Sequence, residues 1–321
     1  MKFHKDILRI DCRTEVERIC DFIHQQVSEM NRDGIVIGLS GGVDSALCVE
    51  LCVRAMGRDK VLGLILPERE SSAFSKEYAL VQAQKIGLDT VTIDITPTLE
   101  GFGTYEKRDG AIKTIFPEYN RQYKSKIYLP ADLLSRDALN FFTLEIKDIN
   151  GGIKSSRLDK RNMLRIVATT NTKQRTRMMH LYYYAEMNNF LVCGTTNRTE
   201  TIQGFFVKYG DGGTDIEPIA HLYKTQIYQL SSHLGVIKEI LERAPSADIF
   251  SLELTDEEFY FRIPYDKLDL LLYAWENNVS IAEVCEAMDL TEEQVKRSFR
   301  DFTAKHNATK HLRMSPPTLT Y

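Results

Sequence analysis

The chain has 321 residues, of which 43% are hydrophobic and 27% are charged, a composition typical of folded globular proteins. Its 41 basic and 45 acidic side chains give a net charge of −4, which argues against general binding to nucleic acid. No run of 18 apolar residues predicts a membrane span, and the N-terminus lacks the apolar core of a signal peptide. The six cysteines form no CxxC pair and favour a reducing, cytoplasmic location; Cys48 and Cys52, four apart on a predicted helix, indicate core packing rather than a metal site.

The first hundred residues alternate between helical and strand-like patterns. Apolar spacing predicts helices, and short β-branched runs bounded by turns predict strands. In chain order we predict a helix over 14–30, a strand at Ile35–Leu39, a helix over 44–56, a strand at Val61–Leu66, a helix over 74–86 and a strand at Thr90–Ile95. Strands separated by helices indicate an α/β fold, with a doubly wound parallel sheet and helices on both faces.

Residues 101–160 are polar and weakly periodic, and we interpret them as an insertion or a flexible lid. Within them, a β-hairpin is predicted around Asn150-Gly151. Regular patterns then return, predicting a helix over 162–188, a strand at Phe190–Cys193, a helix over 222–234 and a helical C-terminal part over about 265–310. We expect a single domain that spans residues 1–321.

The strand Ile35–Leu39 leads directly into Ser40-Gly41-Gly42-Val43-Asp44-Ser45 and a helix start. Glycines allow a tight turn, and the free N–H groups of a helix start attract anions. Asp44 adds a carboxylate that a divalent cation could bridge to phosphate oxygens. The alternative is an ordinary helix cap by Asp44 or Ser45. The pattern SGGxDS resembles the pyrophosphate loop of the N-type ATP pyrophosphatases, which implies an adenine nucleotide alpha hydrolase-like fold, ATP binding and adenylation of a substrate.

Four later segments resemble those of ammonia-dependent NAD synthetases and stand in the same order. They are Asn171-Thr172-Lys173-Gln174-Arg175-Thr176-Arg177-Met178, the run from Gly194 to Glu200, the run from Gly204 to Gly213 followed by Asp215 and Lys224, and Pro245-Ser246-Ala247-Asp248. In the tail, His311-Leu312-Arg313 is similar to a His-Lys-Arg run of that family, with leucine in place of the lysine and the charge of Lys310 at the neighbouring position.

The resemblance implies roles for individual residues. It implies that Asp44 and Lys224 are catalytic and that Asp44 and Glu200 bind Mg²⁺. The residues implied to bind ATP are Ser40, Gly41, Gly42, Asp44, Ser45, Thr195, Lys224 and Ser246. Those implied to bind the substrate are Asn171, Arg175, Lys208, Asp215, Lys310 and His311. The residues alone permit simpler explanations. Arg175 could belong to a solvated basic helix face, Glu200 to the first turn of a helix, Lys208 to a solvated hairpin and Lys310 to a basic tail.

By this resemblance, ATP converts the carboxylate of deamido-NAD to an acyl adenylate, pyrophosphate leaves, and ammonia displaces AMP to form NAD. Mg²⁺ would be the cofactor, ATP a co-substrate, and the protein a homodimer with no nucleic acid or membrane partner. Only about forty residues precede the loop, so we expect free ammonia or a separate glutaminase to supply nitrogen.

Val167 stands where the family often has an aromatic residue, and Pro67–Ser72 and Pro316-Pro317 look more like the glutamine-dependent branch. A different carboxylate substrate and a non-catalytic nucleotide-binding module therefore stay open as alternatives. A tRNA-thiolation enzyme is disfavoured, because no cysteine pair or basic RNA surface is evident.

Overall fold

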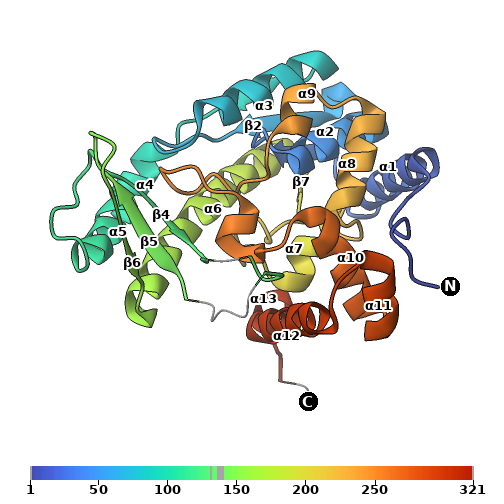
Figure 1. Cartoon of the computed structure of the whole chain (residues 1–321). Coiled ribbons are helices and arrows are strands. Elements are labelled where there is room, and N and C mark those ends of the chain that lie inside the picture. Colours follow the sequence, from blue (N-terminus) through green and yellow to red (C-terminus); the bar gives the residue numbers. More distant parts are fainter. Residues whose placement is uncertain (1, 131, 136–140, 320–321) are drawn as a thin grey trace.

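The centre of the molecule is a four-stranded parallel sheet with strand order β3-β2-β1-β7. Figure 1 labels two of these strands, β2 and β7. The computed structural model describes residues 2–130, 132–135 and 141–319. The strands are β1 (Gly34–Gly38), β2 (Val61–Ile65), β3 (Thr90–Thr92) and β7 (Phe190–Cys193). The chain moves outward from β1 to β2 and β3, and then returns to place β7 on the other side of β1. The sheet is therefore doubly wound, as the sequence predicts.

One face of the sheet is covered by helices that come from both ends of the chain. Ile35 and Ile37 of β1 point into this layer and are fully buried. The helices are α1 (Cys12–Glu29), α2 (Val43–Met56), α3 (Ala73–Ile86), α8 (Lys224–Leu234) and α9 (Lys238–Glu242), with a short 3₁₀ turn, η1 (Arg58–Lys60), before β2. The predicted helix over 222–234 begins two residues late, at Lys224, and the N–H groups of Lys224 and Thr225 donate to Thr199 Oγ1 and Asp269 Oδ2.

The opposite face is covered by α4 (Thr96–Phe102), α5 (Thr104–Lys113) and the long α6 (Lys160–Asn188). Val36, between Ile35 and Ile37, is buried in this second layer, because successive side chains of a strand point to opposite faces. Burial on both faces explains why the strands read as continuous apolar runs. The predicted strand Thr90–Ile95 is shorter in the structure, since regular pairing ends at Thr92.

Residues 101–160 contain regular structure beyond the predicted hairpin. An antiparallel sheet is formed by β4 (Lys124–Tyr128), β5 (Thr143–Lys147) and β6 (Ile153–Arg157), and β5 and β6 are the hairpin predicted around Asn150-Gly151. Residues 131 and 136–140 of this segment lie outside the described residues. Its status as an insertion or lid stays a prediction.

This second sheet supports a loop that matters for the site. The Ser125 amide donates to Ser251 Oγ at 2.8 Å, and Phe250 and Leu254 are buried in the core that β4, β5 and α6 form. The loop of residues 243–256 is therefore held against a folded sheet on one side. Val167 of α6 packs partly buried against the same core.

The C-terminal part is helical, as predicted. It contains α10 (Tyr265–Glu276), α11 (Ile281–Met288), α12 (Glu292–Ala308) and α13 (Lys310–Arg313), preceded by a π-helical turn, η2 (Glu257–Phe261). Together with α7 (Arg198–Gln203) these helices enclose a separate apolar core. This layer closes the molecule below the carboxyl end of β7 (Figure 1).

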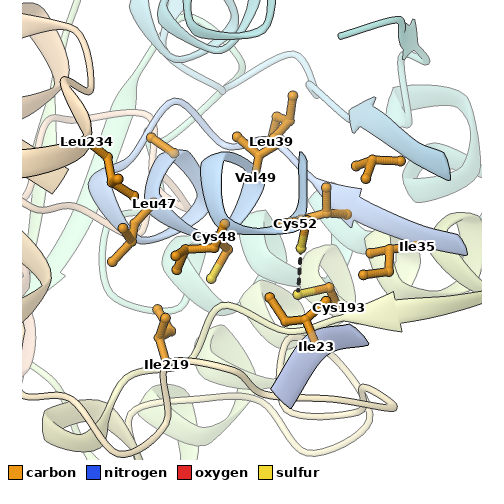
Figure 2. Packing of buried hydrophobic residues seen from close by; sticks show 14 of the residues in the cluster. Ile23, Ile35, Leu39, Leu47, Cys48, Val49, Cys52, Cys193, Ile219 and Leu234 are labelled. Atoms are coloured by element: carbon orange, nitrogen blue, oxygen red, sulfur yellow. Dashed lines mark hydrogen bonds between the residues drawn. The ribbon is translucent and has the colours of Figure 1, made fainter. Parts of the chain in front are cut away.

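Cys48 and Cys52 face the core between α2 and β7 and are fully buried, which confirms the core-packing prediction (Figure 2). Cys52 Sγ lies 3.7 Å from Cys193 Sγ, and burial raises the pKa of the Cys48 thiol. All six cysteines are free thiols. None of the helices in the described part of the chain combines the length and apolar character that crossing a bilayer requires.

Candidate active site

The loop between β1 and α2 adopts a conformation that requires glycine. Gly41 has a φ of 75°, and a Cβ there would lie 2.2 Å from the carbonyl oxygen of Ser75. Gly42 caps α2 without a side-chain acceptor, so the N–H groups of the first turn are left for a ligand. The helix-cap alternative for Asp44 and Ser45 is therefore wrong, and the loop has the construction of an anion site.

Ser45 stabilises this loop from the inside. Its hydroxyl donates to the Gly42 carbonyl at 3.0 Å, accepts from the Ser40 amide at 3.2 Å and lies 3.0 Å from Ser40 Oγ. It is buried and does not line the adjacent cavity. The structure thus places Ser45 behind the loop, and its part in ATP binding stays a prediction.

Lys224, at the start of α8, joins Asp44 after the loop to Glu200 in α7. Its Nζ lies 2.5 Å from Asp44 Oδ2 and 3.3 Å from Glu200 Oε1, and its side chain is 2% exposed. Asn197 completes the group by donating to Asp44 Oδ1 at 2.9 Å and capping α7. The fold therefore brings together three predicted residues that are up to 180 positions apart.

Burial has the largest effect on the pKa values of the side chains in this group. Burial raises the pKa of Glu200 to about 8, although Lys224 acts in the opposite direction. Burial also disfavours the charged form of Lys224, but Asp44, Glu200 and Asp256 together raise its pKa. The lysine therefore stays protonated, and it can neutralise negative charge on a bound polyphosphate.

Asp256 is a member of this group that the sequence reasoning missed. It is 5% exposed, and burial raises its pKa to about 6, with Lys224 opposing and Asp44 adding to the shift. In the sequence it is one acid in the charged stretch Thr255–Phe261, with no motif around it. Asp256 comes near Lys224 only because the segment of residues 243–256 folds back over the loop between β1 and α2.

A cavity of about 260 Å³ lies above the carboxyl ends of β1, β2 and β7. In doubly wound sheets this is where ligands bind, at the point where the strand order reverses, here between β1 and β7. Its walls include seven of the eight predicted ATP-binding residues: Ser40, Gly41, Gly42, Asp44, Thr195, Lys224 and Ser246. Arg177, which donates to the Leu66 carbonyl at 3.1 Å, lines it as well.

The predicted substrate residues lie elsewhere, and none of the six lines this cavity. Arg175 Nε donates to the Lys208 carbonyl at 3.2 Å, and Lys208 Nζ donates to the His311 carbonyl at 3.0 Å. The structure therefore brings Arg175, Lys208 and His311 into one neighbourhood, with Lys310 adjacent and exposed.

Asp215 lies beside β7. It accepts from Tyr182 Oη at 3.0 Å and from the Val192 amide at 2.8 Å. Asn171, half-buried on α6, stands one helical turn before Arg175.

The carboxylates near Lys224 provide ligands of the type that Mg²⁺ prefers. Within the ranges 2–130, 132–135 and 141–319, no three or more His, Cys, Asp or Glu side chains are grouped so as to hold a metal ion by themselves. Mg²⁺ commonly takes one or two carboxylates and completes its coordination with phosphate oxygens and water. Asp44 and Glu200, both in contact with one lysine nitrogen, fit that arrangement.

An uncapped glycine-rich helix start, a buried lysine between carboxylates and a cavity at a strand switch point are features of a nucleotide-binding α/β protein. A family model described as NAD synthase matches residues 15–122 and 108–313. The chain belongs to the NAD synthase family.

Individual relatives agree with this assignment. The chain is 43% identical over 311 residues to the NH₃-dependent NAD⁺ synthetase of Mesorhizobium japonicum, with 97% of each chain covered. It is 44% identical over 314 residues to that of Rhizobium meliloti, covering 98% of this chain and 94% of the relative. Among solved structures, the NH₃-dependent NAD synthetase of Campylobacter jejuni is similar with a TM-score of 0.63 and 25% identity, covering 97% of this chain and all of that one.

Proposed function

We propose that this enzyme forms NAD⁺ from deamido-NAD, ATP and ammonia, releasing AMP and pyrophosphate. The observation that carries the proposal is the contact of Lys224 with Asp44 and Glu200 beside the uncapped start of α2. This is the arrangement that adenylation needs, because negative charge develops on the leaving phosphates and has to be stabilised.

In the proposed reaction the amides of the loop and the first turn of α2 bind the phosphates. Lys224 neutralises charge on the departing pyrophosphate, and Thr195 and Ser246 donate hydrogen bonds to the nucleotide. Asp44 and Glu200 would hold Mg²⁺, which would further neutralise the phosphate charge. Ammonia then forms the C–N bond to the acyl carbon, the bond from that carbon to the AMP oxygen breaks, and the nitrogen releases one proton to water. No enzyme nucleophile is needed, so catalysis rests on positioning and electrostatics.

Deamido-NAD is proposed to bind across Arg175, Lys208 and the chain near His311, with Asn171, Asp215 and Lys310 as further contacts. A guanidinium and ammonium groups suit the two phosphates of a dinucleotide. Because these residues lie outside the ATP cavity, the substrate would enter from a different side than ATP does.

We further propose a homodimer that packs through α6. Met179, Tyr183 and Met187 are four residues apart and 55%, 62% and 60% exposed, so they form an apolar stripe on one helix face. Arg175 lies on the same face, and dimerisation would cover the deamido-NAD site. A monomer in sedimentation velocity at micromolar concentration would contradict this arrangement.

Six free thiols support a reducing cytoplasmic location.

The direct test supplies purified protein with ATP, Mg²⁺, ammonium chloride and deamido-NAD, and separates the products by chromatography. We expect AMP, pyrophosphate and NAD⁺ in equal amounts, and no AMP when deamido-NAD is left out. AMP formation only with another carboxylic acid would keep the chemistry and overturn the substrate. No AMP with any acid would favour a non-catalytic nucleotide-binding module.

A further inference from the structure

One face of α10 carries two polar side chains that the proposed reaction does not use. Tyr265 and Asp269 are four residues apart and share this face. Lys224 Nζ lies 5.4 Å from the centre of the Tyr265 ring, and Tyr265 Oη donates to Asp256 Oδ2 at 3.2 Å. The C-terminal helical layer therefore packs directly against the group around Lys224.

Asp269 is completely buried, and both of its oxygens accept hydrogen bonds. Its Oδ1 accepts from Thr199 Oγ1 at 2.6 Å, and its Oδ2 accepts from the Thr225 amide at 2.7 Å. Thr199 Oγ1 in turn accepts from the Lys224 amide at 3.1 Å. One carboxylate thus joins the first turns of α7 and α8, and its partners are a hydroxyl and a backbone amide.

The two residues that Asp269 contacts are next in sequence to residues of the ion-paired group. Thr199 precedes Glu200 in α7, and Thr225 follows Lys224 in α8. The first N–H groups of a helix have no acceptor in their own helix, so outside partners fix their orientation. For the first two amides of α8 these partners are Thr199 and Asp269. The position of Lys224 relative to Glu200 therefore depends on Asp269.

The charge of Asp269 is not explained by packing. Burial raises the pKa of Asp269 to about 6, and the hydrogen bonds from Thr199 and Thr225 act in the opposite direction. The carboxylate is therefore ionised at weakly alkaline pH. A buried charge that is held by neutral donors costs folding free energy, and an apolar side chain of similar size would fill the same space without that cost.

We propose that Asp269 is a positioning residue for adenylation, because it holds α7 and α8 in the arrangement that keeps Lys224 in contact with Glu200. The proposal rests on the proposed function, in which Lys224 neutralises charge on the departing pyrophosphate. Lys224 can do so only from a fixed place beside the phosphates, since a displacement of about 1 Å can lower a rate by about a hundredfold. The local sequence gives no sign of this role, because Asp269 lies 70 and 44 positions from the residues that it contacts.

Two substitutions of Thr199 separate positioning from packing. Thr199→Val keeps the shape of the side chain but removes the hydroxyl that joins Asp269 to the Lys224 amide, whereas Thr199→Ser keeps the hydroxyl and removes a methyl group. The measurement is exchange of labelled pyrophosphate into ATP at weakly alkaline pH, with deamido-NAD and Mg²⁺ but no ammonium. We expect T199V to lower the saturated exchange rate at least about tenfold, the factor that corresponds to one lost buried hydrogen bond, and T199S to restore most of that loss.

A packing role for Thr199 predicts the reverse order. T199V would then be nearly neutral, and T199S would be the worse variant because it leaves a cavity. Circular dichroism at the assay temperature gives the folded fraction, and rates are compared per folded protein. Exchange by T199V close to that of wild type, or equal losses in the two variants, would overturn the proposal.

Asp269→Asn tests the carboxylate itself, and it carries the test alone if T199V does not fold. Asparagine has the size of aspartate, but its NH₂ group accepts no hydrogen bond, so one of the two contacts is lost. We expect the saturated exchange rate to fall at least about tenfold. The KM for deamido-NAD should stay within about twofold of wild type, because the proposed dinucleotide site around Arg175 and Lys208 is untouched. A KM that rises as much as the rate falls would indicate general loosening of the fold and overturn the proposal, as would exchange at the wild-type rate.

Asp266→Asn is the matched control, because Asp266 lies in the first turn of the same helix and is exposed. It should leave exchange unchanged. An equal fall in D266N would replace the specific contact with a general effect of charge on α10 and overturn the proposal. Failure of the proposed function has a different signature, which is absence of deamido-NAD-dependent exchange in the wild-type protein.

Discussion

Asp44→Asn should lower deamido-NAD-dependent pyrophosphate release by at least about a thousandfold, at the upper end of the loss seen when one transition-state contact is removed. The Asp44 carboxylate lies 2.5 Å from Lys224 Nζ and accepts from Asn197 Nδ2 at 2.9 Å. The asparagine side chain has the size of the aspartate side chain but lacks its charge. That charge holds Lys224 in place and would bind Mg²⁺. The measurement is initial-rate release of pyrophosphate with saturating ATP and Mg²⁺.

Asp21→Asn, an exposed change on α1, is the control and should have no effect. In this variant Lys224 keeps its contact with Glu200, so we expect the protein to fold, and thermal unfolding checks this. Full activity in a folded D44N protein would rule out the role of Asp44 in metal and lysine positioning. Loss of folding instead of activity would show that the contact is structural.

Lys173→Met should destabilise the fold by about 3–5 kcal/mol, the range for removing one partner of a buried ion pair. Lys173 is 2% exposed, and its Nζ donates to Glu68 Oε1 at 2.7 Å, to Glu70 Oε2 at 2.9 Å and to the Ile249 carbonyl at 2.9 Å. These contacts fix the segments 67–72 and 245–250, which contribute to the walls of the cavity at the carboxyl ends of the strands, to α6. The same variant should therefore also raise the KM for ATP.

The effect should depend on pH. Burial alone would raise the pKa of Glu70, but Lys173 and Arg108 lower it to about 2 from its ordinary value of 4.5. A lowered pKa adds stability above pH 4.5, and this stability is lost as the pH falls toward 2. The difference in unfolding free energy between wild type and K173M should thus shrink as the pH falls through that window.

Urea unfolding at several pH values measures this difference. Lys147→Met, an exposed change on β5, is the matched control and should stay within about 0.5 kcal/mol of wild type. A K173M variant as stable as that control would mean that Glu68 and Glu70 find other partners. It would also show that Lys173 is not needed to hold the cavity walls in place.

The segment Asn171–Met178 of α6 shows that the sequence predicted the helix but left the surroundings of its basic side chains ambiguous. Its helical spacing predicts the helix, but three basic residues within five positions also suggest a solvated face. In the structure Lys173 is buried among carboxylates, Arg177 lines the cavity at the carboxyl ends of the strands and Arg175 is exposed. Spacing determines which residues share a face, whereas the partners of Lys173 come from segments about a hundred positions earlier and 76 positions later in the chain.

By itself, the sequence determined the doubly wound sheet and the anion-binding loop, because both depend on local patterns: apolar periodicity, and glycines at a strand-to-helix turn. It also determined the family, since the motifs stand in a characteristic order. Only the tertiary structure decided that Ser45 supports the loop from behind, that Lys224 contacts both Asp44 and Glu200, and that Asp269 contacts the first turns of the helices that carry Lys224 and Glu200. Burial and charge neutralisation depend on which distant segments pack together, and no local pattern records that.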